Sequence, residues 1–287
     1  MRTKFIFLLQ IATFCVFAGR AYQHLFWDAP FRALFWSEDW MSGIVSTVFG
    51  MEWSEYVRSP QTDLTIQRII IAQGIFYALC ATVTAFVRRL PRIFHILLLA
   101  GAICLTFLAF LYTKEKWYHF GQFLEYALQA GSPLLLWYTL GREHLPDRKF
   151  ILIVKVLIAV TFVCHGLYAL NYYPRPGNFT QMTISILGIG ESEAVRFLNF
   201  AGIMDMIIAV GVFLPRRVAL PLLGYAALWG FCTSLARVWA DFYLDYWAES
   251  LHQHAWQTVC RVPHFMIPVA AIWYTMNRKK QEAETSD

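Results

Sequence analysis

Apolar residues gather along this chain into long runs that are separated by short polar connections. Eight such runs of about twenty residues occur, at 5–26, 69–87, 93–112, 120–140, 150–170, 197–215, 218–237 and 256–276. An α-helix rises about 1.5 Å per residue, so about twenty apolar residues suffice to cross the ~30 Å hydrocarbon core of a bilayer. The pattern predicts an all-α, polytopic membrane bundle of about eight transmembrane helices.

Composition agrees with a lipid bilayer as the surroundings of the chain. Hydrophobic residues make up 58% of the sequence and charged residues only 15%, whereas soluble domains carry roughly 25% charged residues. The net charge of +5 does not indicate nucleic acid, because the basic residues stand in short clusters between apolar runs. All six cysteines lie inside apolar runs without metal-ligand spacing. We expect them to pack as small hydrophobic residues, and we expect no metal site.

The basic clusters orient the predicted helices. They fall in every second connection, at 88–92, 142–149 and 216–217, and again at both ends of the chain. Cytoplasmic loops of membrane proteins are enriched in Lys and Arg. We therefore expect both termini on the cytoplasmic side of a bacterial inner membrane, with the acidic connections on the outer side.

A short motif recurs near the end of each half of the chain. The sequence WYTLGR at 137–142 returns as WYTMNR at 273–278, and twelve residues before each Trp stands an ionisable residue, Glu125 or Arg261. The run from Gly74 to Arg89 also aligns without gaps on the run from Gly202 to Arg217. These matches predict two parallel four-helix repeats, 1–145 and 146–287, related by an axis near the membrane normal. The opposite charges of Glu125 and Arg261 then predict a contact between the halves.

Two outer connections are too substantial to be simple loops. Residues 28–66 carry three Trp residues, and residues 178–189 are apolar but too short to span. Because Trp and apolar short segments favour the headgroup layer, we expect both to lie in the outer interface, where they could roof a cavity.

Polar residues in the outer half of the predicted helices are the candidates for a ligand pocket. They are Asp205, His165, Glu125, Arg261, His264, Arg20, His24 and Gln129. A carboxylate such as Asp205, midway along its helix, must face a partner or water, or be protonated, and His165 or Arg261 are its expected partners. The alternative is that these residues make separate hydrogen bonds between helices and that their Arg side chains snorkel to the interface.

One stretch of the second half resembles a known family. Residues 162–170 (FVCHGLYAL) followed by 202–205 (GIMD) resemble the DoxX-like membrane proteins, and the chain is more distantly similar to the membrane part of vitamin K-dependent carboxylase-like proteins. The resemblance implies a helical bundle and quinone- or thiol-linked redox work, with His165 and Asp205 as the positions carried over. In the first half, Arg20 and His24 replace the His-Gly pair.

Three classes of function remain open at this point. The first is a redox-associated membrane protein with a quinone-like ligand. The second is a non-catalytic scaffold that binds another membrane protein. The third is a proton-coupled transporter, against which the helices carry few Gly or Pro breaks, Pro133 and Pro268 being the main exceptions.

Overall fold

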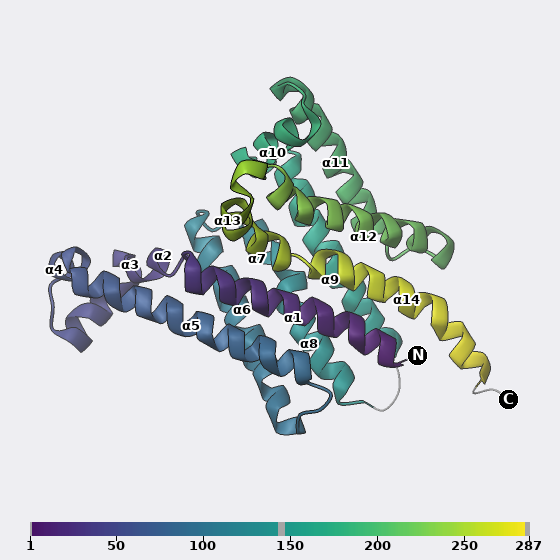
Figure 1. The fold of residues 1–287 in the computed structure, drawn as a ribbon, viewed down its shortest axis with the longest axis horizontal. Helices are drawn as coiled ribbons and strands as arrows, with labels where there is room; N and C mark the ends of the chain where they lie inside the picture. Colours follow the sequence, from purple (N-terminus) through teal and green to yellow (C-terminus); the bar gives the residue numbers. More distant parts are fainter. Residues whose placement is uncertain (1, 143–146, 285–287) are drawn as a thin grey trace.

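The protein is a bundle of helices with both termini at the same end (Figure 1). The structure, a computed structural model, describes residues 2–142 and 147–284, and no β-strand occurs in these ranges. Six helical segments are long and apolar enough to cross a membrane. They are α1 (Arg2–Phe26), α5 (Pro60–Phe86), the 3₁₀ turn η2 (Arg92–His95) continued by α6 (Ile96–Glu115), α9 (Arg148–Ala169), α11 (Glu191–Gly211) and α12 (Arg216–Trp239). The prediction of a helical membrane bundle is confirmed at this level.

The other two predicted spans are divided. Residues 120–140 form α7 (Phe120–Glu125) and α8 (Ala127–Leu140), which meet at Tyr126. Residues 256–276 begin in α13 (Trp247–Val259) and continue in α14 (Pro263–Glu284). The expectation of one uninterrupted helix in each place was therefore wrong.

The hydrogen bonds at the two breaks give the physical reason. Tyr126 N–H bonds to the Phe123 carbonyl, three residues back, and Arg261 N–H bonds in the same way to the Thr258 carbonyl. Such tighter bonds end an α-helix in a turn of 3₁₀ type. Pro263 has no N–H to continue the ladder, and its fixed φ suits the first position of the next helix.

Short helices or helical turns occupy the connections that follow α1, α9 and α12. Residues 28–59 contain α2 (Arg32–Phe35), α3 (Glu38–Ile44), the π-helical turn η1 (Val45–Phe49) and α4 (Trp53–Arg58). The other connections hold α10 (Gly177–Leu187) and the 3₁₀ turn η3 (Leu244–Tyr246). All of these lie toward the end of the bundle away from the termini (Figure 1). The helix after the first connection begins at Pro60, earlier than the predicted residue 69, because Pro60 is a favourable first residue of a helix.

Helices from both ends of the sequence share one interior. Helix α1 packs against α5, α8, α13 and α14, while α9 packs against α7, α8, α11 and α14. One large cluster of buried apolar side chains includes Phe5 of α1, Ile158 of α9 and Tyr274 of α14. The predicted boundary between residues 145 and 146 lies outside the described residues.

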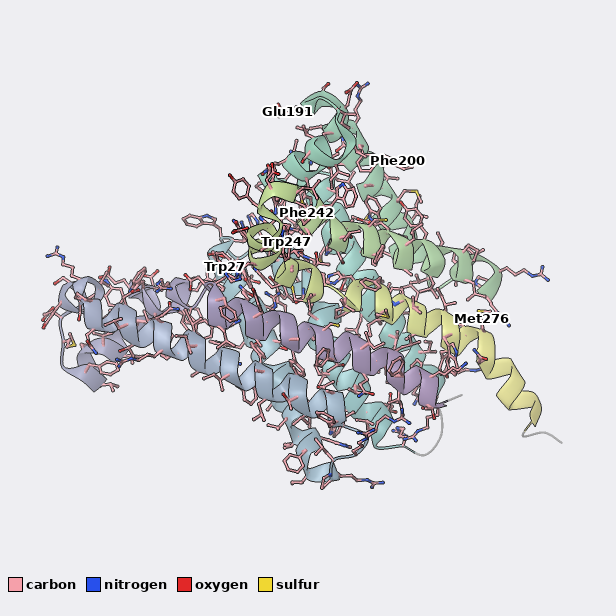
Figure 2. All side chains as sticks on the ribbon, viewed as in Figure 1. Trp27, Glu191, Phe200, Phe242, Trp247 and Met276 are labelled. Atoms are coloured by element: carbon pink, nitrogen blue, oxygen red, sulfur yellow. The ribbon has the colours of Figure 1, made fainter. Side chains whose placement is uncertain are left out.

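The outer faces of the helices carry large apolar side chains. Phe200 of α11 and Met276 of α14 project outward from the bundle (Figure 2) and are 60% and 53% exposed. Many further residues of this kind are exposed along the six long helices. A surface of this composition is suited to lipid rather than to water.

Helix α12 touches α14 at a glycine. A Cβ atom added to Gly230 would lie 2.6 Å from the backbone oxygen of His264, whereas one added to Gly224 of the same helix would meet nothing within 4 Å. Small residues at such crossings allow helix backbones to approach closely in a membrane.

We predict that Gly230→Ala destabilises the protein by about 1–3 kcal/mol, because the backbone of α14 has to move. Gly224→Ala is the matched control. It should be neutral or stabilise by up to about 1 kcal/mol, since alanine favours a helix over glycine. Thermal unfolding of both variants in the same detergent measures the difference, and equal unfolding temperatures would contradict the crossing described above.

Candidate functional site

An ion pair joins the two divided spans. The Glu125 Oε1 atom, at the end of α7, lies 3.3 Å from Nη1 of Arg261, in the break between α13 and α14. His165 of α9 places its Nε2 atom 3.5 Å from the same carboxylate oxygen, and Gln122 Nε2 donates to the other oxygen. The predicted contact between Glu125 and Arg261 is present. It is well buried, since the two side chains are only 10% and 17% exposed.

A cavity of about 250 Å³ lies beside this ion pair. One part of its wall carries the polar side chains His165, Asp205, Arg237, Arg261 and His264. The rest is mostly apolar and comes from α10, α11 and α12, including Phe179, Met182, Ile186, Leu187, Phe197, Leu198 and Trp229. Segment 178–189, which was expected to cover a cavity, does form part of this wall through α10.

Asp205 sits in the cavity wall without an ionic partner. It is 3% exposed, and its Oδ1 atom has no hydrogen-bond partner among the described residues. Neither expected pair, with His165 or with Arg261, is an ion pair among the described residues, although all three side chains line the cavity. A buried polar atom without a partner costs about 1–3 kcal/mol.

Two glycines bring Asp205 close to His165. A Cβ atom added to Gly166, the residue after His165, would lie 3.0 Å from the Gly202 carbonyl oxygen and 3.2 Å from the Cβ of Asp205. One added to Gly202 would lie 3.0 Å from the Gly166 carbonyl oxygen. Helices α9 and α11 can approach this closely only because both positions lack a side chain. The two polar side chains consequently reach one cavity from neighbouring helices.

Two histidines complete the polar wall. The rings of His165 and His264 meet edge to face, with centroids 5.4 Å apart. The Nδ1 atom of His264 pairs with the Arg261 carbonyl oxygen at 3.0 Å, which leaves its Nε2 atom buried and unpaired. The Nε2 atom of His165 also lacks a hydrogen bond. Because His165 Nε2 faces Glu125, two buried polar atoms near the cavity are left without a hydrogen bond or ion pair among the described residues, Asp205 Oδ1 and His264 Nε2. No group of three or more His, Cys, Asp or Glu in the described part of the chain could hold a metal ion.

The remaining predicted pocket residues form a second cluster, away from the cavity wall. The Arg20 guanidinium donates to Gln23 at 2.6 Å and to Gln129 at 2.8 Å, and it lies over the rings of Tyr112 and Tyr126. The Nδ1 atom of His24 pairs with the Arg20 carbonyl oxygen at 2.7 Å. Of the eight predicted residues, Asp205, His165, Arg261 and His264 line the cavity, whereas Arg20, His24, Gln129 and Glu125 do not, although Glu125 pairs with Arg261.

Sequence reasoning expected α10 to cover a cavity but did not assign Trp229 to its wall. Trp229 lies in the wall next to Asp205. A single Trp in an apolar helix carries no signal that separates a cavity position from a lipid-facing one. For α10, an apolar stretch too short to span was the only signal that could indicate the cavity.

Removing one partner of the buried ion pair should be much worse than removing both. We predict that Glu125→Gln or Arg261→Gln alone destabilises the protein by about 3–5 kcal/mol, because one charge is left buried and unpaired. The double variant should recover at least about 1 kcal/mol relative to the sum of the two losses. Chemical unfolding of the purified protein measures this coupling.

Asp63→Asn provides the surface control for this cycle. The Asp63 carboxylate pairs with Arg32 at 2.9 Å but is 47% exposed, so its removal should change stability by less than about 1 kcal/mol. Strictly additive losses for Glu125 and Arg261 would mean that the two charges do not depend on each other.

Comparison of the chain with protein-family models, with curated proteins and with solved structures finds no match.

Proposed function

We propose that this protein is an integral membrane protein that binds a small amphipathic, quinone-like ligand in the cavity between α9, α10, α11 and α12. The observation that carries the proposal is a mostly apolar cavity wall that also holds five Asp, Arg and His side chains. Ligand sites are typically lined by apolar side chains with a few polar groups that fix orientation. A quinone needs this combination, because its ring and tail are apolar while its carbonyl oxygens accept hydrogen bonds.

The size of the cavity and its opening to the surface suit a ligand whose head group lies inside the protein and whose tail lies in the membrane. Its volume of about 250 Å³ lies slightly below the range of about 300–1,000 Å³ that holds drug-sized ligands. Leu187 of α10 and Cys232 of α12 line the cavity and are also exposed on the outer surface. A ring could therefore occupy the interior while an attached chain passes between α10 and α12 toward the lipid.

We further infer two parallel repeats of four spans each. The packing supports this, because several contacts between long helices recur in equivalent form. Helix α1 packs on α5 as α9 packs on α11, α6 packs on α8 as α12 packs on α14, and α1 packs on α13 as α9 packs on α7. The two breaks, at Tyr126 and at 260–262, also fall at equivalent positions in the alignment that pairs Glu125 with Arg261.

The proposed repeat makes the cavity a property of the second half. Matching Thr13-Phe14 with Thr161-Phe162 places Phe17 opposite His165, and the alignment of Gly74 with Gly202 places Tyr77 opposite Asp205. Phe17 and Tyr77 are fully buried and stack at 6.1 Å, so apolar rings fill the equivalent place in the first half. A ligand function for His165 and Asp205 fits this difference, since both also belong to the stretch that resembles DoxX-like proteins. Membership of that family and a redox role remain predictions.

The two helix breaks favour a proton-coupled transporter as a second candidate. Transporters often build their sites from discontinuous helices near the bilayer midplane, and here Glu125 and Arg261 stand at the breaks. The sequence has few Gly or Pro residues that would indicate such breaks, and the break at Tyr126 involves neither residue type. A scaffold without a ligand is less well supported, because it gives no reason for the unpaired polar atoms at the cavity.

Filling the cavity should abolish binding without unfolding the protein. We predict that Ala236→Phe, in the cavity wall on α12, weakens the binding of a short-chain benzoquinone at least tenfold by occupying its space. Ala227→Phe is the matched control on the same helix, because Ala227 is also partly buried but does not line the cavity. Titration of the purified protein with the quinone, followed by thermal stability, gives both affinities. Equal weakening by both variants, or no binding by the unaltered protein, would contradict the proposed function.

We also propose that both termini lie on the cytoplasmic side of a bacterial inner membrane. In support, the exposed basic pairs at 88–89 and 216–217 stand at the end of the bundle that holds both termini. Arg2 reaches the last carbonyls of α8, and the Tyr274 hydroxyl donates to the Asp147 carbonyl, so these segments meet at the same end.

A fusion experiment tests this orientation. A fluorescent protein attached after residue 287 should fluoresce in a bacterial host, whereas alkaline phosphatase at that position should be inactive. The same reporters inserted at Gly188, between α10 and α11 at the opposite end, should give the reverse result. An active phosphatase at the C-terminus would show that the orientation is wrong.

A further inference from the structure

Positive charge exceeds negative charge inside the bundle. Among the described residues, the interior holds three guanidinium groups, those of Arg20, Arg237 and Arg261, and two carboxylates, those of Glu125 and Asp205. Even with both carboxylates ionised, one positive charge has no counter-charge. Charges within a membrane protein are costly unless they are paired or face a polar cavity.

The unpaired charge belongs to Arg237 rather than to Arg20. Arg20 does not line the cavity, and two amide oxygens and two aromatic rings surround its guanidinium. Arg237 lines the cavity near the C-terminal end of α12, with its guanidinium over the ring of Phe179 at 5.8 Å. Its Nε atom is buried without a hydrogen bond, and no carboxylate of the described residues lies within ion-pair distance.

The cavity separates Arg237 from the acidic side chain. A small side pocket contacts Asp205, His165, His264 and Trp229, but neither Arg237 nor Arg261. Arg237 stands eight residues beyond Trp229 on α12, which corresponds to about 12 Å along the helix axis. A negatively charged group at the Arg237 end would therefore meet two guanidiniums while staying away from the Asp205 carboxyl.

We propose that the cavity binds an amphipathic anion, with a single carboxylate or phosphate group held between Arg237 and Arg261 and an apolar body against α10 and α11. Guanidinium groups bind both oxyanions well because their N–H groups match the spacing of the oxygens. The apolar body lies against Phe179, Met182 and Phe197 and leaves through the mouth at Leu187 and Cys232. This inference rests on the part of the proposed function that places an amphipathic ligand in this cavity, and it differs from the quinone in giving that ligand a negative charge.

Four compounds test the charge of the ligand on the full-length protein in a non-ionic detergent. Octanoate and octyl phosphate should bind and raise the unfolding temperature, while neutral methyl octanoate should bind at least about tenfold more weakly, as expected for the loss of a charge-assisted hydrogen bond. Inorganic phosphate alone should have no effect at the same concentration. Equal binding of methyl octanoate and octanoate would overturn the inference, and so would equal stabilisation by inorganic phosphate.

Variants of Arg237 locate the effect. Arg237→Gln should weaken octanoate binding about tenfold while changing methyl octanoate binding less than twofold, and Arg237→Lys should retain most of the affinity. Arg196→Gln is the control, because Arg196 is exposed on α11 and does not line the cavity. Unchanged octanoate binding by Arg237→Gln would overturn the inference.

The quinone titration separates this inference from the proposed function. If the short-chain benzoquinone binds and the two anions do not, the cavity takes a neutral ligand and only the charge is wrong. If none of the compounds binds, both proposals fail.

Discussion

A carboxylate and a guanidinium inside a bilayer each carry a large desolvation penalty, and their pairing is what makes both tolerable. In this protein the pair is Glu125 and Arg261, and each stands at a break between two consecutive helices. The contact joins α7 of the first half to the α13–α14 break of the second half. Because His165 of α9 approaches the same carboxylate, three segments distant in sequence are held together at one point. The cavity lies against this point, so its polar wall depends on the ion pair.

Close helix contacts determine the shape of the rest of the site. Gly166 and Gly202 allow α9 and α11 to touch, and Gly230 allows α12 to touch α14. These crossings place His165, Asp205 and His264 around one space instead of on separate lipid-facing surfaces. Across the proposed repeat, Phe17 and Tyr77 fill the equivalent space with stacked rings. In the proposed alignment, Phe17 and Tyr77 correspond to His165 and Asp205 on helices that pack in a similar way. These side chains explain why the second half has a cavity where the first half is filled.

Hydropathy predicted six of the spans because every residue of a long run contributes to that signal. It did not predict the breaks, since each depends on two or three hydrogen bonds and only Pro263 marks one of them in the sequence. The repeated motif correctly led to the contact of Glu125 with Arg261, because it fixed the relative depth of the two residues. The same depth argument grouped Arg20, His24 and Gln129 with the cavity. It was wrong there, since depth does not say which way a side chain points around the helix axis.

The sequence by itself determined that this chain is a helical membrane protein, where its long helices lie, and which ionisable residues had to find partners inside it. The physical reason is the low polarity of the hydrocarbon core, which penalises every exposed polar group in the same way regardless of fold. Only the tertiary structure decided that Glu125 and Arg261 pair, and that Asp205 and Arg237 line a cavity with no ion-pair partner among the described residues. Those outcomes depend on the rotation and crossing of each helix, which are set by the close packing of side chains from the whole chain.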